Sequence, residues 1–408
     1  MARNRKAAIS FIFITLLIDI TGLGLIIPVL PKLIQQLMHS SISEAAKIGG
    51  WLTITYAIMQ FFFAPILGGI SDRFGRRPVL LFSLFGFSMD YIFLSLAPTI
   101  GWLFVGRAIA GITGASITTA SAYIADISTP ENRTKNFGMV GAAFGLGFIV
   151  GPVIGGLLGS FGPRLPFIVA ATLSFINWLY GYFILPESLS LENRRVFSWK
   201  RANPLGSLKK LYRYPALGGL IGSFLLIYIA SHAVQSNWSY FTIEKLHWNE
   251  KMIGISLGVV GILVALVQGF LTRIINPRLG NEKSVYAGML LYTAGLVLFA
   301  FASQTWMMFV FLIPYCLGGI AGPALQSILS GNVLPSEQGE LQGILTSLVS
   351  LTSIIGPPLM TGTFSYFTGP HAPVHFSGAA FLLGAILMLT GTFLTYRTLS
   401  SRRIKADG

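Results

Sequence analysis

The sequence predicts an all-α membrane protein of twelve transmembrane helices, arranged as two pseudo-symmetric bundles of six. Composition is the first reason, because 53% of the 408 residues are hydrophobic and only 10% are charged, against about 25% charged residues in an average soluble protein. The second reason is the presence of twelve apolar runs, each close to the length of about 20 residues that crosses a bilayer. The third reason is that basic residues gather between these runs.

The apolar runs divide evenly between the two halves of the chain. Those of the first half lie near residues 7–30, 48–70, 78–97, 100–127, 137–159 and 166–186. Those of the second half lie near residues 216–240, 252–274, 284–303, 305–333, 342–367 and 374–397. The longest polar stretch separates the halves and carries Arg194, Arg195, Lys200, Arg201, Lys209, Lys210 and Arg213. We therefore expect an N-terminal bundle at 1–186, a cytoplasmic linker at 187–215 and a C-terminal bundle at 216–408.

The distribution of Lys and Arg predicts the topology, because basic residues in short loops stay on the cytoplasmic side. With the N-terminus inside, the cytoplasmic segments hold most of the 28 basic residues. The external loops hold only Lys32, Lys47, Arg164, Lys245 and Lys251. Both termini are thus expected in the cytoplasm. No small-residue cleavage pattern follows the first apolar run, so we interpret it as a retained helix.

Composition also argues against several functions. The net charge of +14 lies in loops rather than on a folded polar domain, which disfavours nucleic-acid binding. The one cysteine, Cys316, lies in an apolar run, so no disulfide framework and no metal-ligand spacing are expected. The sequence has no nucleophile elbow, phosphate loop or His/Cys/Asp cluster, so we expect no enzyme, metal or cofactor.

Three ionisable residues lie inside apolar runs, where a charge is costly and is a functional hypothesis by default. Asp19 lies deep in the first helix and is the candidate protonation switch, although it could instead hydrogen-bond a neighbouring helix. Asp90 lies in the third helix. Arg107 lies in the fourth and needs a carboxylate or several carbonyls as partners. Asp19 and Arg107 could share one cavity, and proton or cargo binding would then break their coupling.

The loop after the second helix, GGISDRFGRRPVL, is the candidate cytoplasmic gate. A carboxylate and several guanidiniums beside helix ends can form a latch that closes in one state and opens in another. Asp126, at the inner end of the fourth helix, is its candidate partner. A plain basic anchor and a solvated terminal acid are the competing interpretations. The predicted gate residues are Asp72, Arg73, Gly75, Arg76, Arg77 and Asp126.

The fifth helix contains GLGFIVGPVIGG, which predicts a bend or a close helix crossing. The residues concerned are Gly145, Gly151, Pro152, Gly155 and Gly156. Simple packing of small residues is the alternative.

A set of polar and aromatic residues within the helices suits a planar, polar-aromatic cargo. Each of them could instead serve helix packing. The candidates are Gln60, His232, Gln235, Asn237, Trp238, Phe241 and Gln326.

Taken together, these segments resemble the major facilitator superfamily and, within it, its drug/proton antiporters. The resemblance rests on GxxSDRxGRRPVL after the second helix, GRxxxGxTGA in the fourth and GPxxGG in the fifth. The segments DITGLGLIIPVLP, SDRFGRRPVLLFSLFGFSMDY, FGMVGAAFGLGFIVGPVIGG, PALQSILS and EQGELQGILTSL are similar to the tetracycline/proton antiporters. The resemblance covers nearly the whole chain.

This resemblance implies twelve helices, alternating access and the exchange of inward protons for outward drug. It also implies a bacterial inner-membrane location and a monomer. Asp19, Asp72, Asp90, Arg107 and Asp126 fall on that group's functional motif positions.

The chain departs from the tetracycline group at two points. Its ninth helix, AGMLLYTAGLVLFAFAS, lacks the acidic residue found in that group, and its eighth helix has Val264 where the group can show a histidine. Proton coupling would then rest on the N-terminal half, and another amphipathic compound remains open as cargo. An importer or exporter of a metabolite or siderophore is the main alternative, and a membrane-embedded enzyme or a receptor subunit is a third.

Overall fold

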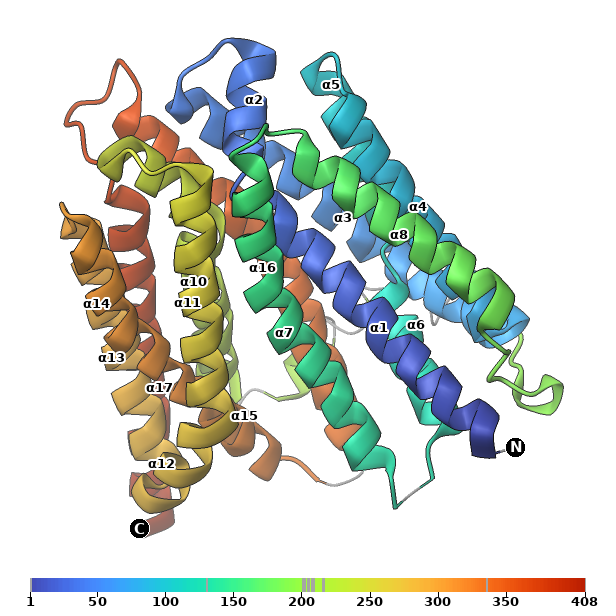
Figure 1. Cartoon of the computed structure of the whole chain (residues 1–408). Helices are drawn as coiled ribbons and strands as arrows, with labels where there is room; N and C mark the ends of the chain where they lie inside the picture. The colour runs from blue at the N-terminus through green and yellow to red at the C-terminus, as the bar shows by residue number, and fades with distance from the viewer. Residues whose placement is uncertain are drawn as a thin grey trace. The chain divides into compact units, whose positions relative to one another are not determined.

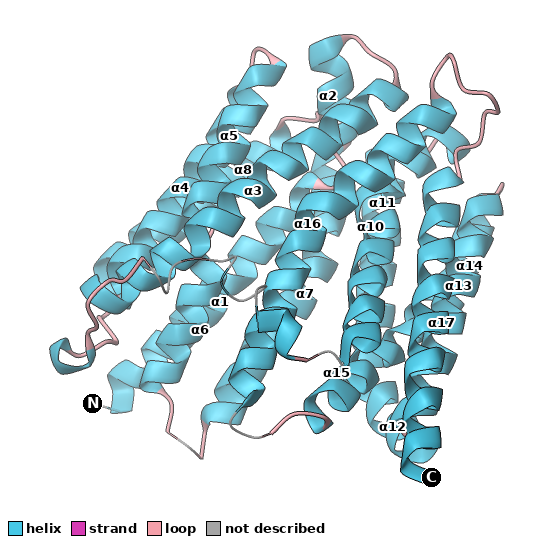
Figure 2. Ribbon diagram, turned by 180° about the vertical axis from the view of Figure 1, so that it is seen from behind, coloured by secondary structure: helices cyan, strands magenta, loops and turns pink. Residues whose placement is uncertain are grey.

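The computed structural model describes residues 2–129, 131–199, 203, 206, 210–214, 217–334 and 337–407. These residues form helices joined by short connections, and Figure 2 shows no strand among them. Lys200, Arg201 and Lys209 of the predicted linker lie outside the described residues.

The helices of the first half follow one another with few residues between them (Figure 1). They are α1 (Ala2–Ile26), α2 (Leu30–Met38), α3 (Ile42–Phe74), α4 (Arg76–Leu96), α5 (Ile100–Thr113), α6 (Ser116–Ile127), α7 (Arg133–Gly159) and α8 (Leu165–Ile184). Two short 3₁₀ turns follow, η1 (Leu191–Asn193) and η2 (Lys210–Arg213).

The second half is built in the same way. Its elements are α10 (Gly218–Leu246), α11 (Glu250–Leu266), the π-helical turn η4 (Val267–Leu271), α12 (Thr272–Leu279), α13 (Asn281–Phe301), α14 (Thr305–Leu317), the 3₁₀ turn η5 (Gly318–Ile320), α15 (Ala321–Gly331), α16 (Gln338–Thr368) and α17 (Ala379–Asp407).

Twelve helical stretches among the described residues are long and apolar enough to cross a membrane. This confirms the twelve predicted spans. The second span differs most from the prediction, because it begins at Ile42 instead of near residue 48 and continues to Phe74. The residues from Ile42 to Lys47 are too polar to count as part of the apolar run, but they belong to the same helix.

Three spans that the sequence analysis expected to be continuous are interrupted. The fourth breaks at Gly114, between α5 and α6. The eighth contains the π-turn η4, and the tenth contains the 3₁₀ turn η5. Glycine has a low helix propensity because of its backbone entropy, and glycines occur at Gly114, Gly269, Gly318 and Gly319 in these three interruptions.

The chain forms two compact units that do not follow the order of the sequence strictly. Unit 1 comprises Met1–Ser40, Thr55–Pro204 and Asn249–Gly261, and unit 2 comprises Ser41–Ile54, Leu205–Trp248 and Ile262–Gly408. Helices α3 and α11 are therefore each divided between the units.

Each exchanged segment is held inside its unit by close packing. In unit 2 the Ser43 hydroxyl donates a hydrogen bond to the Ser365 carbonyl oxygen, 2.7 Å away. In unit 1, a Cβ atom placed on Gly156 would lie 2.9 Å from Cα of Gly254. Glycines on both helices thus let α11 approach α7 at backbone distance.

The α1–α7 contact in unit 1 also depends on glycine. A Cβ on Gly151 would meet Cα of Gly24 at 2.9 Å, and one on Gly155 would meet Cα of Leu25 at 2.8 Å. Three of the glycines predicted for a close crossing, Gly151, Gly155 and Gly156, thus lie in such contacts, whereas Gly145 has open space around its Cβ position. Pro152 lies inside α7, whose helix continues through it.

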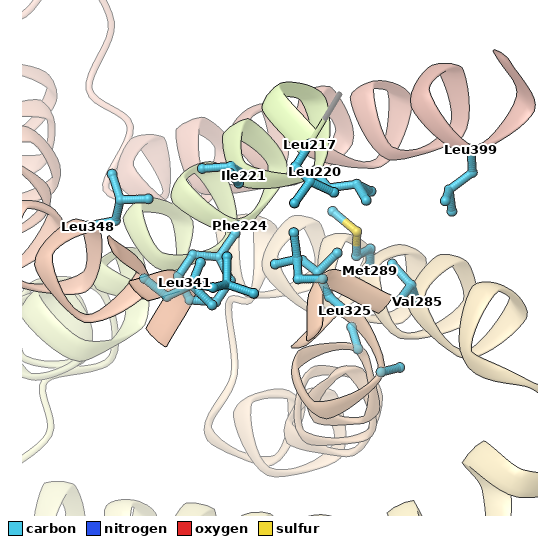
Figure 3. Close-up of a cluster of buried hydrophobic side chains, with 14 of the residues drawn as sticks. Leu217, Leu220, Ile221, Phe224, Val285, Met289, Leu325, Leu341, Leu348 and Leu399 are labelled. Atoms are coloured by element: carbon cyan, nitrogen blue, oxygen red, sulfur yellow. The ribbon is translucent and has the colours of Figure 1, made fainter. Parts of the chain in front are cut away.

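Each unit has an apolar core. In unit 1 the core joins α1, α4, α6 and α7 through residues such as Leu16, Leu84 and Tyr123. In unit 2 it joins α10, α13, α15, α16 and α17, and Figure 3 shows Phe224 and Leu341 within this cluster. These cores hold in position the helices that carry the polar side chains of each unit.

Candidate functional site

Asp90 and Arg107 form a buried ion pair between α4 and α5. The Asp90 side chain has no exposed surface, and Arg107 is 12% exposed. Arg107 donates through Nε to Oδ1 of Asp90 at 3.2 Å, and its Nη2 donates to Oδ2 of the same carboxylate. Gly106 allows this approach, since a Cβ there would lie 2.8 Å from Oδ1 of Asp90. The two-point geometry is the one that guanidinium and carboxylate prefer.

The ion pair continues into a polar chain on α3. The Arg107 guanidinium carbon lies 5.8 Å from the centre of the Tyr56 ring, a distance at which a cation is attracted to the ring face. The Gln60 amide donates to the Tyr56 hydroxyl at 2.9 Å and to the Gly114 carbonyl oxygen at 3.1 Å. Because Gly114 lies at the α5–α6 break, Gln60 satisfies a carbonyl that the broken helix leaves free.

Asp19 lies in α1 of the same unit in a different environment. It is 5% exposed, and neither carboxylate oxygen has a hydrogen-bond partner among the described residues. It interacts with the side chain of Ser116, the first residue of α6, and with the hydroxyls of Tyr56 and Tyr91. Asp19 and Arg107 both interact with Tyr56, but the Arg107 guanidinium forms its ion pair with Asp90.

Three of the predicted gate residues, Asp72, Arg76 and Asp126, meet where α3 and α6 end and α4 begins. Arg76 donates through Nη1 to Oδ1 of Asp72 at 2.6 Å and through Nε to Oδ2 of Asp126 at 3.1 Å. One guanidinium thus links two carboxylates from two other helices. Arg77 donates to the Tyr182 carbonyl oxygen at 2.6 Å, and Arg73 lies over the Phe74 ring at 5.0 Å.

Glu187, which the sequence analysis missed, completes this cluster. Its carboxylate accepts hydrogen bonds from the backbone N–H groups of Arg76 at 2.8 Å and Arg77 at 3.2 Å, at the N-terminus of α4. It also accepts from the N–H groups of Ser188 and Leu189. A carboxylate is favourable at a helix N-terminus, but an acid directly after an apolar run carries no sequence signal for a partner over 100 positions away.

Gly75 is needed at the turn before α4 for two reasons. Its φ is +110°, a conformation that residues with a side chain rarely adopt. A Cβ there would also meet the Glu187 carboxyl carbon at 2.6 Å.

The predicted cargo contacts of unit 2 fall into two groups. Asn237, Trp238 and Phe241 are buried inside the unit, where Trp238 packs on Phe299 and Phe241 on Phe381. His232 is buried too, against Gly356. Packing accounts for Trp238, Phe241 and His232, whereas both polar atoms of the buried Asn237 amide have no hydrogen-bond partner among the described residues.

The glutamines of the predicted set lie nearer to the surface of their units. Gln235 donates to the Ser231 hydroxyl at 3.2 Å, and Gln326 donates to the Gln342 carbonyl oxygen at 3.2 Å, both in exposed positions. Gln235 and Gln326 are exposed and can still contact a cargo, whereas Gln60 is partly buried and its amide nitrogen bonds Tyr56 and Gly114.

The ninth span carries a tyrosine where the sequence analysis noted the lack of an acid. The Tyr292 hydroxyl of α13 donates to the Tyr315 hydroxyl of α14 at 3.0 Å. Unit 2 therefore has a neutral hydroxyl pair between its ninth and tenth spans, whereas unit 1 has the Asp90–Arg107 ion pair between its third and fourth. Among the described residues no group of three or more His, Cys, Asp or Glu side chains could hold a metal ion.

Comparisons with known proteins agree with this architecture. The sequence pattern of the Major Facilitator Superfamily matches residues 12–313 and 241–407. The class C tetracycline resistance protein of Escherichia coli is 41% identical, over 94% of each chain. The class G protein of Vibrio anguillarum is 38% identical, over 94% of this chain and 96% of its own length.

Solved structures share the fold at lower identity. The nucleoside transporter NupG superposes with a TM-score of 0.78 at 14% identity, over 96% of this chain and 99% of its own. The human organic anion transporter MFSD10 superposes with a TM-score of 0.70 at 22% identity, also over 96% of this chain and 99% of its own.

Proposed function

The chain belongs to the Major Facilitator Superfamily and, within it, to the tetracycline resistance proteins, and on this premise we propose that it exports tetracycline or similar amphipathic compounds in exchange for protons by alternating access. It is a multi-pass protein of the bacterial inner membrane. The identity with the tetracycline resistance proteins extends over nearly the whole chain, which favours a common cargo class.

The contrast between the two buried carboxylates of unit 1 carries the proposal for proton coupling. Asp90 is neutralised by Arg107, so its charged form is compensated. Asp19 is buried, has no ion-pair partner among the described residues and has the neutral side chain of Ser116 beside it, and an uncompensated buried charge is costly. Asp19 is therefore the group that gains most by taking up a proton, and we assign it as the protonation switch.

The cluster of Arg76 with Asp72 and Asp126 serves in this proposal as the cytoplasmic gate. A single guanidinium between two carboxylates can exchange one partner for another at little cost in charge compensation. Breaking either contact would release one helix end without leaving Arg76 unpaired. The gate can thus open in steps.

The remaining features of the proposal rest on the lack of a reactive-group motif in the sequence and, for the oligomeric state, on the family resemblance. We propose that the protein has no enzymatic activity, uses no cofactor besides the proton gradient and works as a monomer. The electrical part of that gradient contributes about 2.3 kcal/mol per 100 mV for each proton.

Proton release from energised inverted vesicles on addition of tetracycline tests the proposal. Wild-type protein should release protons in a tetracycline-dependent way, and Asp19→Asn at matched expression should not. The control is Glu44→Gln, which makes the same chemical change at an exposed acid in the first turn of α3 and should behave as wild type.

Two outcomes would contradict the proposal in different ways. A full response of Asp19→Asn would remove Asp19 as the switch but leave antiport standing. A wild-type protein that carries protons and cargo in the same direction would favour the importer interpretation instead.

A further inference from the structure

Glutamine side chains lie beside the broken helices of both units. In unit 1, Gln60 of the second span bonds the Gly114 carbonyl oxygen at the break of the fourth span. Counting spans from the start of each half, the eighth corresponds to the second and the tenth to the fourth. The tenth span is also interrupted, at η5, and Gln268 lies in the eighth.

Gln268 lies next to this second interruption. The π-turn η4, which contains Gln268, packs against η5. A Cβ placed on Gly319 would lie 3.9 Å from Nε2 of Gln268. The arrangement of glutamine beside a broken helix thus occurs in both units, although the sequence analysis singled out only Gln60.

The two glutamines differ in what their amides contact. The Gln60 amide bonds Tyr56 and Gly114, whereas the Gln268 side chain is exposed on unit 2 and has no hydrogen-bond partner within the described part of the chain. Gln268 is eleven residues from Leu279, the end of its span, which places it about 16 Å along the helix axis from that end. An amide at this depth cannot face hydrocarbon without a large cost.

The π-turn gives a reason for the orientation of this amide. A π-turn inserts one residue into an α-helix, rotates the residues that follow and is frequently found at functional sites. Here Val267 is buried, while the next residue, Gln268, is not. The irregular turn thus separates the packed side of the helix from a polar side chain left without a partner.

We propose that Gln268 binds cargo, and that its amide donates to and accepts from the oxygen-rich polar edge of a planar amphipathic molecule such as tetracycline. This inference rests on the proposed function. In this proposal the Gln268 amide of unit 2 bonds the cargo, whereas the corresponding Gln60 amide of unit 1 bonds the carbonyl oxygen at the helix break.

Cargo uptake into inverted vesicles tests the inference. The variant Gln268→Met keeps the length of the side chain and removes the amide. Its KM for tetracycline should rise about three- to tenfold, the effect of losing one or two neutral hydrogen bonds, while its maximal rate stays near that of wild type. The matched control is Gln36→Met, at an exposed glutamine of α2, which should leave KM unchanged.

Protection of an introduced thiol gives a second readout that does not depend on the Met variant. In Gln268→Cys the only other thiol is Cys316, which is buried, so a water-soluble thiol reagent should report on position 268. Tetracycline should slow its reaction several-fold. An unchanged KM in Gln268→Met, a fall in maximal rate alone, or the absence of protection would overturn the inference. A wild-type protein that transports neither tetracycline nor any similar amphipathic compound would overturn the proposed function, and this inference with it.

Discussion

At the scale of single residues, the two acids of the first and third helices show what a sequence can and cannot reveal. The cost of a charge in an apolar run identified Asp19 and Asp90 as functional candidates. Their partners could not be derived in this way, because pairing depends on which faces of α1, α4 and α5 meet. The structure pairs Arg107 with Asp90, seventeen positions away in sequence, and leaves Asp19 alone.

Substitution in the Asp90–Arg107 pair should lower the free energy of unfolding more than substitution of Asp19. Asp90→Asn leaves the buried guanidinium without a counter-charge and should lower the free energy of unfolding by about 3–5 kcal/mol. Asp19→Asn removes no ion pair and should change it little. Thermal unfolding in detergent measures both variants. Combining Asp90→Asn with Arg107→Gln should recover part of the loss, and strictly additive effects would show that the two side chains are not coupled.

At the scale of elements, the sequence predicted which helices exist better than it predicted how they begin, break and touch. The spans followed from apolar run length, which is a local property. The break at Gly114 depends on a side chain from another helix, Gln60, and the π-turn at Val267–Leu271 carries no signal in its apolar run besides one glycine. Glycine alone did not reveal them, because glycine also serves close packing, as at Gly155.

The N-terminus of α4 should depend on Glu187. Glu187→Ala removes the acceptor for the N–H groups of Arg76 and Arg77, and loss of such a cap costs about 0.5–2 kcal/mol. Unfolding in detergent should show this decrease, and tetracycline transport should fall because Arg76 loses its fixed position in the gate. Glu192→Ala, an exposed acid five residues on, is the control. Equal stability of the two variants would rule out Glu187 as a cap.

Two glycines of α7 should differ in how much their substitution destabilises the α1–α7 crossing. Gly155→Val would force apart the backbones at Leu25, and overpacking of this kind costs about 1–3 kcal/mol. Gly145→Val meets open space and should cost less, since its side chain displaces no neighbour and valine has a somewhat better helix propensity than glycine. A similar loss of folded protein in both variants would mean that the crossing does not depend on close backbone approach. Monodispersity and thermal unfolding of the purified variants provide the comparison.

At the scale of the whole molecule, the units differ from the domains expected from sequence order. The polar linker suggested a division near residues 187–215, and much of each half does stay in its own unit. The exchange of Ser41–Ile54 and Asn249–Gly261 could not be foreseen, because it depends on where α3 and α11 touch other helices. In unit 1, Lys32 of α2 also bonds Glu250, the first residue of α11, at 2.7 Å, so charge as well as glycine packing holds the exchanged segment.

Because α11 is divided between the units, it can be used to test whether transport requires Asn249–Gly261 to separate from the rest of unit 1. A Cβ on Gly258 would lie 2.5 Å from Cγ2 of Val153. Because Cγ2 is one bond from the Val153 Cβ, the two Cβ positions come within reach of the separation of about 3.5–4.5 Å found in disulfides. The double variant Val153→Cys/Gly258→Cys should therefore cross-link on oxidation. If alternating access separates α11 from α7, the oxidised protein should stop transporting tetracycline and recover on reduction, while each single variant remains active in both states. Undiminished transport by the cross-linked protein would instead mean that Asn249–Gly261 moves with unit 1, and that α11 bends near Gly261, where the units divide it.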